Sequence, residues 1–137
     1  MSHPDGLPDR FLDRSLGRVQ VPRLLRAAGL RLVTLAEHYG VPQDEDVADT
    51  EWLELAGRNG WAVLLKDARI RGRTVERQTV QQFNVRCFCI TRQDLTAAQM
   101  VDRYLRHLDA ITTACTDPGP FIYAVHEPRI ERLGLDG

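Results

Sequence analysis

A short uninterrupted apolar run, Trp61–Leu65, is the feature that most constrains the fold of this chain. A strand that is apolar on both faces is buried on both, which is typical of a parallel sheet covered by helices. Four other short apolar runs alternate with segments of helical spacing. The expected strands are 11–13, 30–35, 61–65, 85–90 and 121–125, and the expected helices are 21–29, 49–59, 74–82 and 95–115. This alternation predicts an α/β fold, a single-domain three-layer α/β/α sandwich with a mostly parallel central sheet.

The length of 137 residues indicates one domain. We expect a flexible N-terminus over residues 1–9, the domain over 10–125 and a short C-terminal tail over 126–137. No apolar run reaches the ~20 residues of a membrane helix, and the first residues lack a secretory signal. Three cysteines without zinc-site spacing favour a reducing cytoplasm. Cys87 and Cys89 alternate along an expected strand and are interpreted as core residues.

Three aspartates stand at the ends of these elements. Asp13 follows the first apolar run, Asp67 follows the third, and Asp49 opens a helical segment that Asp49 or Thr50 can cap. If the two runs are neighbouring parallel strands, Asp13 and Asp67 emerge at the same carboxyl edge, where open α/β folds bind ligands. Carboxylates gathered there repel one another unless a cation joins them. The cation expected to bind there is a magnesium ion, which in proteins commonly acts on phosphate esters.

Charge is distributed unevenly along the chain. Residues 32–57 carry seven acids and no Lys or Arg, whereas residues 58–77 carry six basic residues and two acids. An acidic pocket beside a basic rim suits a metal together with a polyanion. Two solvated faces of opposite sign would give the same pattern, so both interpretations stay open.

The residues resemble a known family. The matching blocks, in chain order, are Phe11-Leu12-Asp13-Arg14, Pro22–Gly29, Asp49–Leu53 and Leu64-Leu65-Lys66-Asp67. This pattern is similar to that of PIN-like proteins grouped with the VapC-type ribonuclease toxins of bacterial toxin–antitoxin pairs. The resemblance implies a Mg²⁺- or Mn²⁺-dependent endoribonuclease that acts on RNA, is neutralised by a cognate antitoxin protein and often forms a homodimer.

By position, Asp13, Asp49 and Asp67 resemble the catalytic metal ligands of this family. Leu65 stands where the family signature has a threonine, which removes a hydroxyl that could orient the site. The family also carries a glutamate on an early helix, for which Glu37 and Glu51 are candidates, and Glu51 is the one we include among the metal ligands.

Three basic residues are candidates for substrate contact. Lys66 and Arg69 flank Asp67, and Arg14 follows Asp13, so all three fall at the same predicted sheet edge. Arg pairs with phosphate through two hydrogen bonds, which suits an RNA backbone. The neighbouring acids Asp44, Glu45 and Asp46 are expected to be solvated.

Two other interpretations remain. A catalytically silent PIN-like module that binds RNA or a partner protein would account for Leu65. A receiver-like signalling domain also gathers acids and one Lys at a sheet edge, but Lys66 precedes Asp67 on the same strand, which disfavours it.

Overall fold

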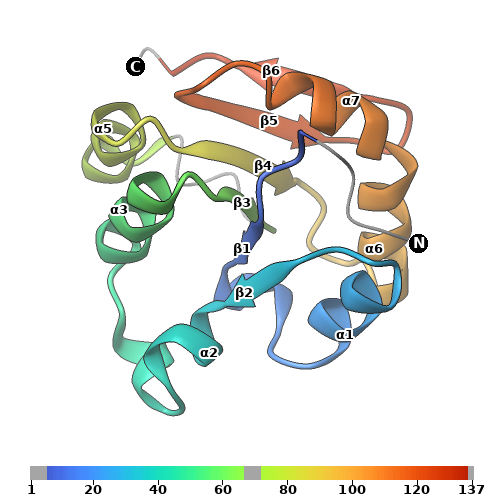
Figure 1. The fold of residues 1–137 in the computed structure, drawn as a ribbon, viewed down its shortest axis with the longest axis horizontal. Helices are drawn as coiled ribbons and strands as arrows, with labels where there is room; N and C mark the ends of the chain where they lie inside the picture. The colour runs from blue at the N-terminus through green and yellow to red at the C-terminus, as the bar shows by residue number, and fades with distance from the viewer. Residues whose placement is uncertain (1–5, 67–71, 136–137) are drawn as a thin grey trace.

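The computed structural model describes residues 6–66 and 72–135. In these residues one six-stranded sheet has the order β2-β1-β3-β4-β5-β6 (Figure 1). The strands are β1 (Arg10–Leu12), β2 (Leu32–Thr34), β3 (Ala62–Leu65), β4 (Arg86–Ile90), β5 (Phe121–Val125) and β6 (Ile130–Leu133). The first five are parallel to their neighbours, and β6 runs antiparallel to β5. The prediction of a mostly parallel sheet is confirmed.

Helices cover both faces of this sheet. The α-helices are α1 (Gln20–Ala27), α2 (Leu35–Tyr39), α3 (Asp49–Asn59), α5 (Thr74–Gln82), α6 (Ala97–Arg106) and α7 (Leu108–Ala114), and the short 3-10 helices are η1 (Arg14–Leu16) and η2 (Gln43–Asp46). Figure 1 shows α3 and α5 on one side of the strands and α1, α6 and α7 on the other. The three-layer α/β/α sandwich is therefore confirmed.

Strand β3 shows why the apolar run predicted this architecture. Ala62 and Leu64 pack into the core under α1 and α6, while Val63 and Leu65 pack into the core under α3 and α5. All four residues are at most 2% exposed. Burying one such Val or Leu side chain stabilises a fold by about 1.5–3 kcal/mol, so both layers depend on this strand.

The chain between the expected strand over 30–35 and the expected helix over 49–59, for which we predicted no element, contains α2 and η2. Helix α2 begins at a capping box, in which the Thr34 hydroxyl accepts from the Glu37 amide and the Glu37 carboxylate accepts from the Thr34 amide. The Thr-x-x-Glu spacing was the sequence signal for this start. The cap prediction for α3 was also wrong, because Ala48 occupies the cap position and Asp49 is the first helical residue.

The long helix predicted over residues 95–115 is divided at His107 into α6 and α7. The His107 backbone leaves helical geometry with φ −105° and ψ 18°. Its ring lies 2.8 Å from the Glu127 carbonyl oxygen, which ties this corner to the chain that follows β5. A contact between residues so far apart in sequence leaves no periodic signal.

Both ends of the described chain are more ordered than the sequence suggested. Strand β6 lies in the predicted tail, where Ile130 pairs with Val125. Leu7, within the predicted flexible N-terminus, is only 4% exposed and packs into the core. Within residues 6–66 and 72–135, no helix is long and apolar enough to cross a membrane.

Candidate active site

The carboxyl ends of β1 and β3 lie side by side, as the sequence predicted. The register pairs Leu12 with Leu64, and the Asp13 amide continues this pairing by donating to the Leu64 carbonyl at 3.2 Å. Asp13 and Lys66 therefore follow neighbouring strands at one edge of the sheet. Asp67 and Arg69, which the sequence also placed here, lie outside the described residues.

Asp13 is a buried carboxylate with one unsatisfied oxygen. It is 8% exposed and caps η1, with its Oδ2 accepting from the Ser15 amide at 3.3 Å and the Ser15 hydroxyl at 2.8 Å. Its Oδ1 is buried, and no residue within 6–66 and 72–135 donates a hydrogen bond to it. Burial raises the pKa of Asp13, and the nearby negative charge of Asp49 raises that pKa further, against the lowering effect of the Ser15 hydrogen bonds. An oxygen in this state is suited to a ligand that brings positive charge.

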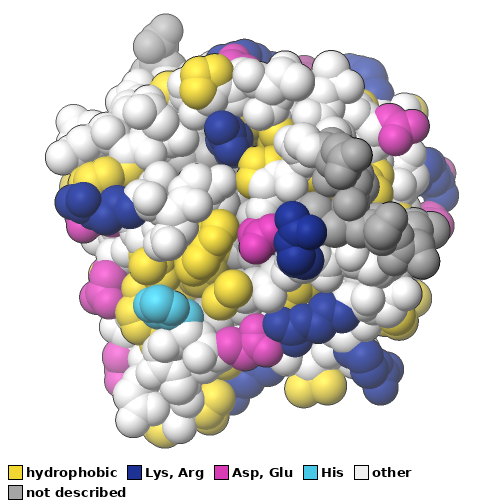
Figure 2. Space-filling view, in the orientation of Figure 1, with side chains coloured by type: hydrophobic (Ala, Val, Ile, Leu, Met, Phe, Trp, Pro, Cys, Tyr) yellow, Lys and Arg dark blue, Asp and Glu magenta, His cyan; other side chains and the backbone are white. Residues whose placement is uncertain are grey.

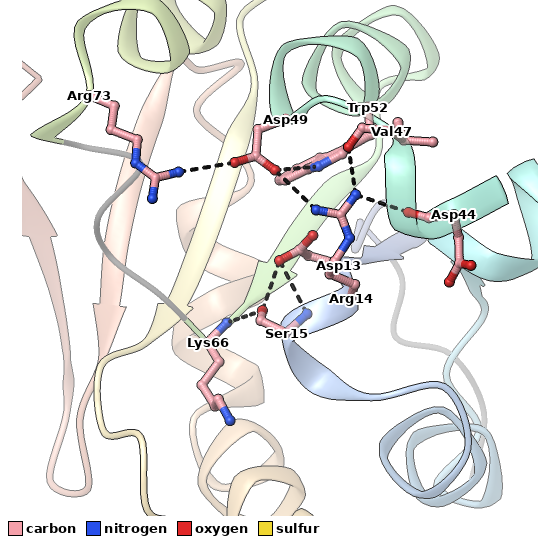
Figure 3. Close-up of polar contacts among 9 residues, drawn as sticks. All are labelled: Asp13, Arg14, Ser15, Asp44, Val47, Asp49, Trp52, Lys66 and Arg73. Atoms are coloured by element: carbon pink, nitrogen blue, oxygen red, sulfur yellow. Dashed lines mark hydrogen bonds and ion pairs between the residues drawn. The ribbon is translucent and has the colours of Figure 1, made fainter. Parts of the chain in front are cut away.

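Ser15 connects the two strand ends and was missed in the sequence. Its hydroxyl donates to Asp13 and accepts from the Lys66 amide at 3.0 Å (Figure 3). The Asp-x-Ser spacing, in which an aspartate accepts from the amide two residues later, is a turn signal that could have indicated the contact. Ser15 thereby fixes the orientation of the Asp13 carboxylate.

Asp49 lies at the start of α3 and faces the same space, but both of its oxygens have partners. Oδ1 accepts from the Trp52 indole at 3.0 Å and lies 3.8 Å from Arg14. Oδ2 accepts from Arg73 at 3.3 Å. The two Arg contacts are longer than the 2.7–2.9 Å typical of strong charge-assisted hydrogen bonds, so a competing cation meets weak opposition there.

Arg14, predicted to contact substrate, is held by the protein itself. Its Nη2 donates to the carbonyl oxygens of Asp44 at 3.0 Å and Val47 at 2.5 Å, while its Nη1 approaches Asp49. Figure 3 shows the guanidinium between η2 and α3. In this arrangement Arg14 positions the start of α3 relative to the end of β1.

The side chains of the other described site candidates make contacts elsewhere. Figure 3 shows the Lys66 side chain pointing away from both aspartates. Glu51 is exposed and lies beside Tyr39, whose pKa is raised to about 12 by burial and by the Glu51 charge. Glu37 caps α2 and accepts from Arg26 at 2.8 Å, which lowers the pKa of Glu37. The alternative placements of the family glutamate therefore both fall on residues engaged elsewhere.

Asp44 was predicted to be solvated, and the structure contradicts this. It is 2% exposed, and its two oxygens accept from Arg18 at 2.7 Å and 3.0 Å. The Arg18 guanidinium lowers the pKa of the Asp44 carboxyl. The partners are 26 residues apart, and nothing in the sequence indicates their pairing.

The uneven charge along the sequence does not become two separate faces. Acids of the 32–57 segment pair with arginines from other segments, and these pairs include Glu37–Arg26, Asp44–Arg18, Glu45–Arg18, Asp49–Arg14, Asp49–Arg73 and Glu54–Arg58. Figure 2 shows acidic and basic side chains next to one another near the centre of the visible face. The folded chain thus interleaves charges that the sequence separates.

The donor groups at this edge include carboxylates that could hold a metal ion. Within residues 6–66 and 72–135, no three His, Cys, Asp or Glu side chains come together as a metal-binding group. Asp13 and Asp49 supply two carboxylates that interact electrostatically. The unsatisfied Oδ1 of Asp13 fits a hard divalent cation, which prefers oxygen ligands.

Cys87 and Cys89 pack together in the core under α3 and α5, whereas Cys115 packs on the opposite side of the sheet. All three are buried free cysteines. The interpretation of Cys87 and Cys89 as core residues is confirmed, and the three cysteines do not form a common site.

The mostly parallel sheet of this strand order, with aspartates at its carboxyl edge, places the protein in a class of α/β proteins. Comparison with known proteins identifies the family. Residues 8–92 match the model of the family described as "PIN like domain", and the chain belongs to that family. The chain is also similar to a protein of Mycobacterium tuberculosis named "Putative ribonuclease VapC45". The two are 50% identical over 123 residues, which cover 90% of this chain and 89% of that protein. No solved structure matched the chain.

Proposed function

We propose that this protein is a divalent-metal-dependent endoribonuclease that acts as the toxin of a toxin–antitoxin pair. The observation that carries the proposal is the buried Oδ1 of Asp13 at the carboxyl edge of the sheet, which has no hydrogen-bond donor in the part of the chain that the structure describes. Membership of the PIN-like family and the ribonuclease name of the similar protein from Mycobacterium tuberculosis support the same activity.

Asp13 and Asp49, joined by Asp67, would hold a Mg²⁺ or Mn²⁺ ion. When bound, such an ion supplies an activated water for attack on an RNA phosphodiester and offsets the charge that develops on the phosphorus oxygens. We include Asp67 among the proposed metal ligands because it follows β3 in the sequence. The donor set is all oxygen, which matches the preference of Mg²⁺ and Mn²⁺ over softer metals.

The protein's own residues prepare this site. Ser15 holds the Asp13 carboxylate in one orientation through its hydroxyl and amide. Leu65, in place of the family's threonine, is 2% exposed in the core, so it offers nothing to the site. Ser15 supplies a hydroxyl at the strand ends instead. Arg14 and Arg73, at 3.8 Å and 3.3 Å from Asp49, can transfer to the phosphate as substrate enters.

The implied partners follow from the toxin assignment. We propose RNA as the substrate and a cognate antitoxin as the inhibitor, in the cytoplasm and without membrane attachment. Lys66 and Arg69 remain candidates for substrate contact beside Arg14, because they flank Asp67 in the chain. A homodimer is the form expected from the resemblance to VapC-type toxins.

A catalytically silent binding module is the second candidate. It is favoured by the engagement of both Asp49 oxygens with Arg14, Arg73 and Trp52, which leaves that carboxylate without an open position. In such a module the arginines would replace the metal permanently. RNA would then be bound but not cut.

Cleavage of total RNA by the purified protein tests the proposal. Discrete cuts are expected with Mg²⁺ or Mn²⁺ and none with EDTA. Asp13→Asn and Asp67→Asn should each abolish them, whereas Asp46→Asn, at an exposed aspartate, should cut like the wild type. RNA binding without cleavage at any metal concentration would favour the silent module and overturn the nuclease.

A further inference from the structure

A polar hollow of about 220 Å³ opens between α6 and the chain segments that follow β4 and β5. The polar side chains that line it are Arg92, Gln99, Asp102, Arg103, Arg106 and Glu127. Arg92 follows the end of β4 and Glu127 follows the end of β5, so the hollow opens on the sheet edge that carries Asp13. None of these residues belongs to the site described above.

The hollow and the aspartates are close along this edge. Strand β4 is separated from β1 by β3 alone, so their ends lie about 10 Å apart at ordinary strand spacing. A direct link exists as well, because the side-chain Nε2 of Gln93 donates to the Lys66 carbonyl oxygen at 3.3 Å. An extended RNA strand that crosses the end of β1 can therefore continue over the hollow.

Arg103 is the residue that gives the hollow a chemical preference. It is 8% exposed, and within the described part of the chain it donates no hydrogen bond and forms no ion pair. Arg103 lines the hollow, so the five donors of its guanidinium are available to an acceptor that enters this space. The arrangement is explained if an acceptor arrives from outside the molecule.

The other arginines that line the hollow already form ion pairs with acidic side chains. Arg92 donates to both oxygens of Asp94 at 2.8 Å and 2.9 Å. Arg106 donates to Asp102 at 2.6 Å and lies 4.0 Å from Glu127. These acids hold the net charge of the hollow low. It therefore suits one singly charged phosphodiester better than a doubly charged terminal phosphate.

We propose that Arg103 binds a backbone phosphodiester of the RNA strand whose scissile phosphate lies at Asp13. The inference rests on the proposed ribonuclease function and adds a substrate subsite to it. Arg103 matches this ligand because its planar guanidinium donates two parallel hydrogen bonds to phosphate oxygens. The contact carries no base specificity, and it sets where the strand lies relative to the aspartates.

Binding of a single-stranded RNA oligonucleotide, in EDTA so that no cleavage occurs, tests the subsite directly. Arg103→Gln should weaken binding about tenfold, as expected for the loss of charged hydrogen bonds. It should also reduce the slope of log Kd against log salt by about 0.7, the value for one phosphate contact on a single strand. Arg58→Gln removes an equal charge from the C-terminal end of α3, remote from this edge, and should leave both quantities unchanged.

A second variant keeps the test decisive if Arg103→Gln does not fold. Gln99 caps α6 by accepting from the Thr96 amide, and a glutamate can make the same contact. Gln99→Glu should therefore leave the fold intact, place a negative charge in the hollow and weaken RNA binding. Unchanged binding in this variant would overturn the subsite.

The outcomes separate this inference from the nuclease proposal. Suppose that Arg103→Gln weakens RNA binding and reduces the slope of log Kd against log salt, but the wild-type protein cuts no RNA. This result would support the subsite and reject the nuclease. Metal-dependent cutting with unchanged Kd, slope and KM in both variants would reject the subsite alone. An effect of Arg103→Gln confined to RNA with a 5′-phosphate, and absent with a 5′-hydroxyl, would assign the hollow to a terminal phosphate and overturn the backbone contact.

Discussion

Asp13 and Asp44 are two buried aspartates whose surroundings are opposite. Asp44 is 2% exposed, and both of its oxygens accept from Arg18. Asp13 is 8% exposed and accepts from the amide and hydroxyl of Ser15, and among the described residues its other oxygen has no donor. Accordingly, the pKa of Asp44 is lowered by its arginine, whereas the pKa of Asp13 is raised by burial.

The difference separates a structural charge from a functional one. When a buried carboxylate is paired within the chain, the ion pair offsets the cost of removing the charge from water. In this protein the pair between Asp44 and Arg18 joins η2 to the chain after η1. A buried carboxylate that no cation accompanies opposes folding and persists only if it serves another purpose. On this argument we propose that Asp13, and not Asp44, is the carboxylate that receives a ligand.

The substitution of Asp13 tests this distinction with the largest expected effect. Asp13→Asn should reduce metal-dependent RNA cleavage by at least about 100-fold, because loss of a direct ligand exceeds the 10–100-fold cost of losing an outer-shell partner. Initial rates with Mn²⁺ measure it. Asp46→Asn, at an exposed aspartate, is the matched control. Equal rates for wild type and Asp13→Asn would show that Asp13 has no functional role that distinguishes it from Asp44.

The hydroxyl beside Asp13 carries the next largest effect. Ser15→Ala should weaken Mn²⁺ binding by about 10–100-fold, because the Asp13 carboxylate loses its shortest hydrogen bond and its fixed orientation. Titration calorimetry measures this affinity. Ser15→Thr keeps the hydroxyl and should restore most of it. If the alanine variant binds metal as tightly as the wild type, Ser15 serves only to join β1 to β3.

Sequence alone predicted the parts of the site that depend on strand order. A fully apolar β3 and the alternation around it placed Asp13 at the carboxyl edge, and the structure confirms that position. The same reasoning found α5 over residues 74–82 and β5 over 121–125 with the bounds that the structure has. These features follow from local periodicity and from the geometry of parallel sheets.

What the sequence did not predict depends on contacts between distant segments. Arg18 meets Asp44 across 26 residues, and Arg73 meets Asp49 across 24. The turn from α6 into α7 depends on His107 and Glu127 in the same way. Side-chain pairing of this kind is decided by tertiary packing, which no local pattern encodes.

The pH dependence of stability should differ in sign between the two aspartates. Because the pKa of Asp44 is lowered, its stabilising effect is present above the ordinary value of 3.8 and is lost as pH falls through its folded-state pKa. Because the pKa of Asp13 is raised, its favourable contribution is present below 3.8 and is lost as pH rises through its folded-state pKa. At pH 7 the two charges therefore act on stability in opposite directions.

Thermal unfolding in EDTA measures this contrast. At pH 7, Asp44→Asn should lower the Tm by a few degrees, and Asp13→Asn should raise it. The difference for Asp13→Asn should shrink as the pH falls toward 3.8, because the raised pKa lets the folded-state carboxyl protonate above that value. The difference for Asp44→Asn should persist down to 3.8 and shrink only below it, because the pKa of Asp44 is lowered. A lower Tm for Asp13→Asn at pH 7 would mean that the Ser15 contacts outweigh the cost of burying the charge, and the comparison would need revision.

Asp49 stands between the two extremes, and its arginine contacts give the smallest expected effect. Arg73 lies 3.3 Å from Asp49 with both side chains partly exposed, and such pairs contribute about 0–1 kcal/mol. Arg73→Gln should therefore raise Mn²⁺ affinity by no more than about fivefold, because one competing cation is removed. Arg58→Gln, which breaks a pair with Glu54 instead, should leave the affinity unchanged. A weaker affinity in Arg73→Gln would show that Arg73 supports the metal-bound arrangement, and Asp49 would then belong with Asp44 as a carboxylate whose cation is part of the fold.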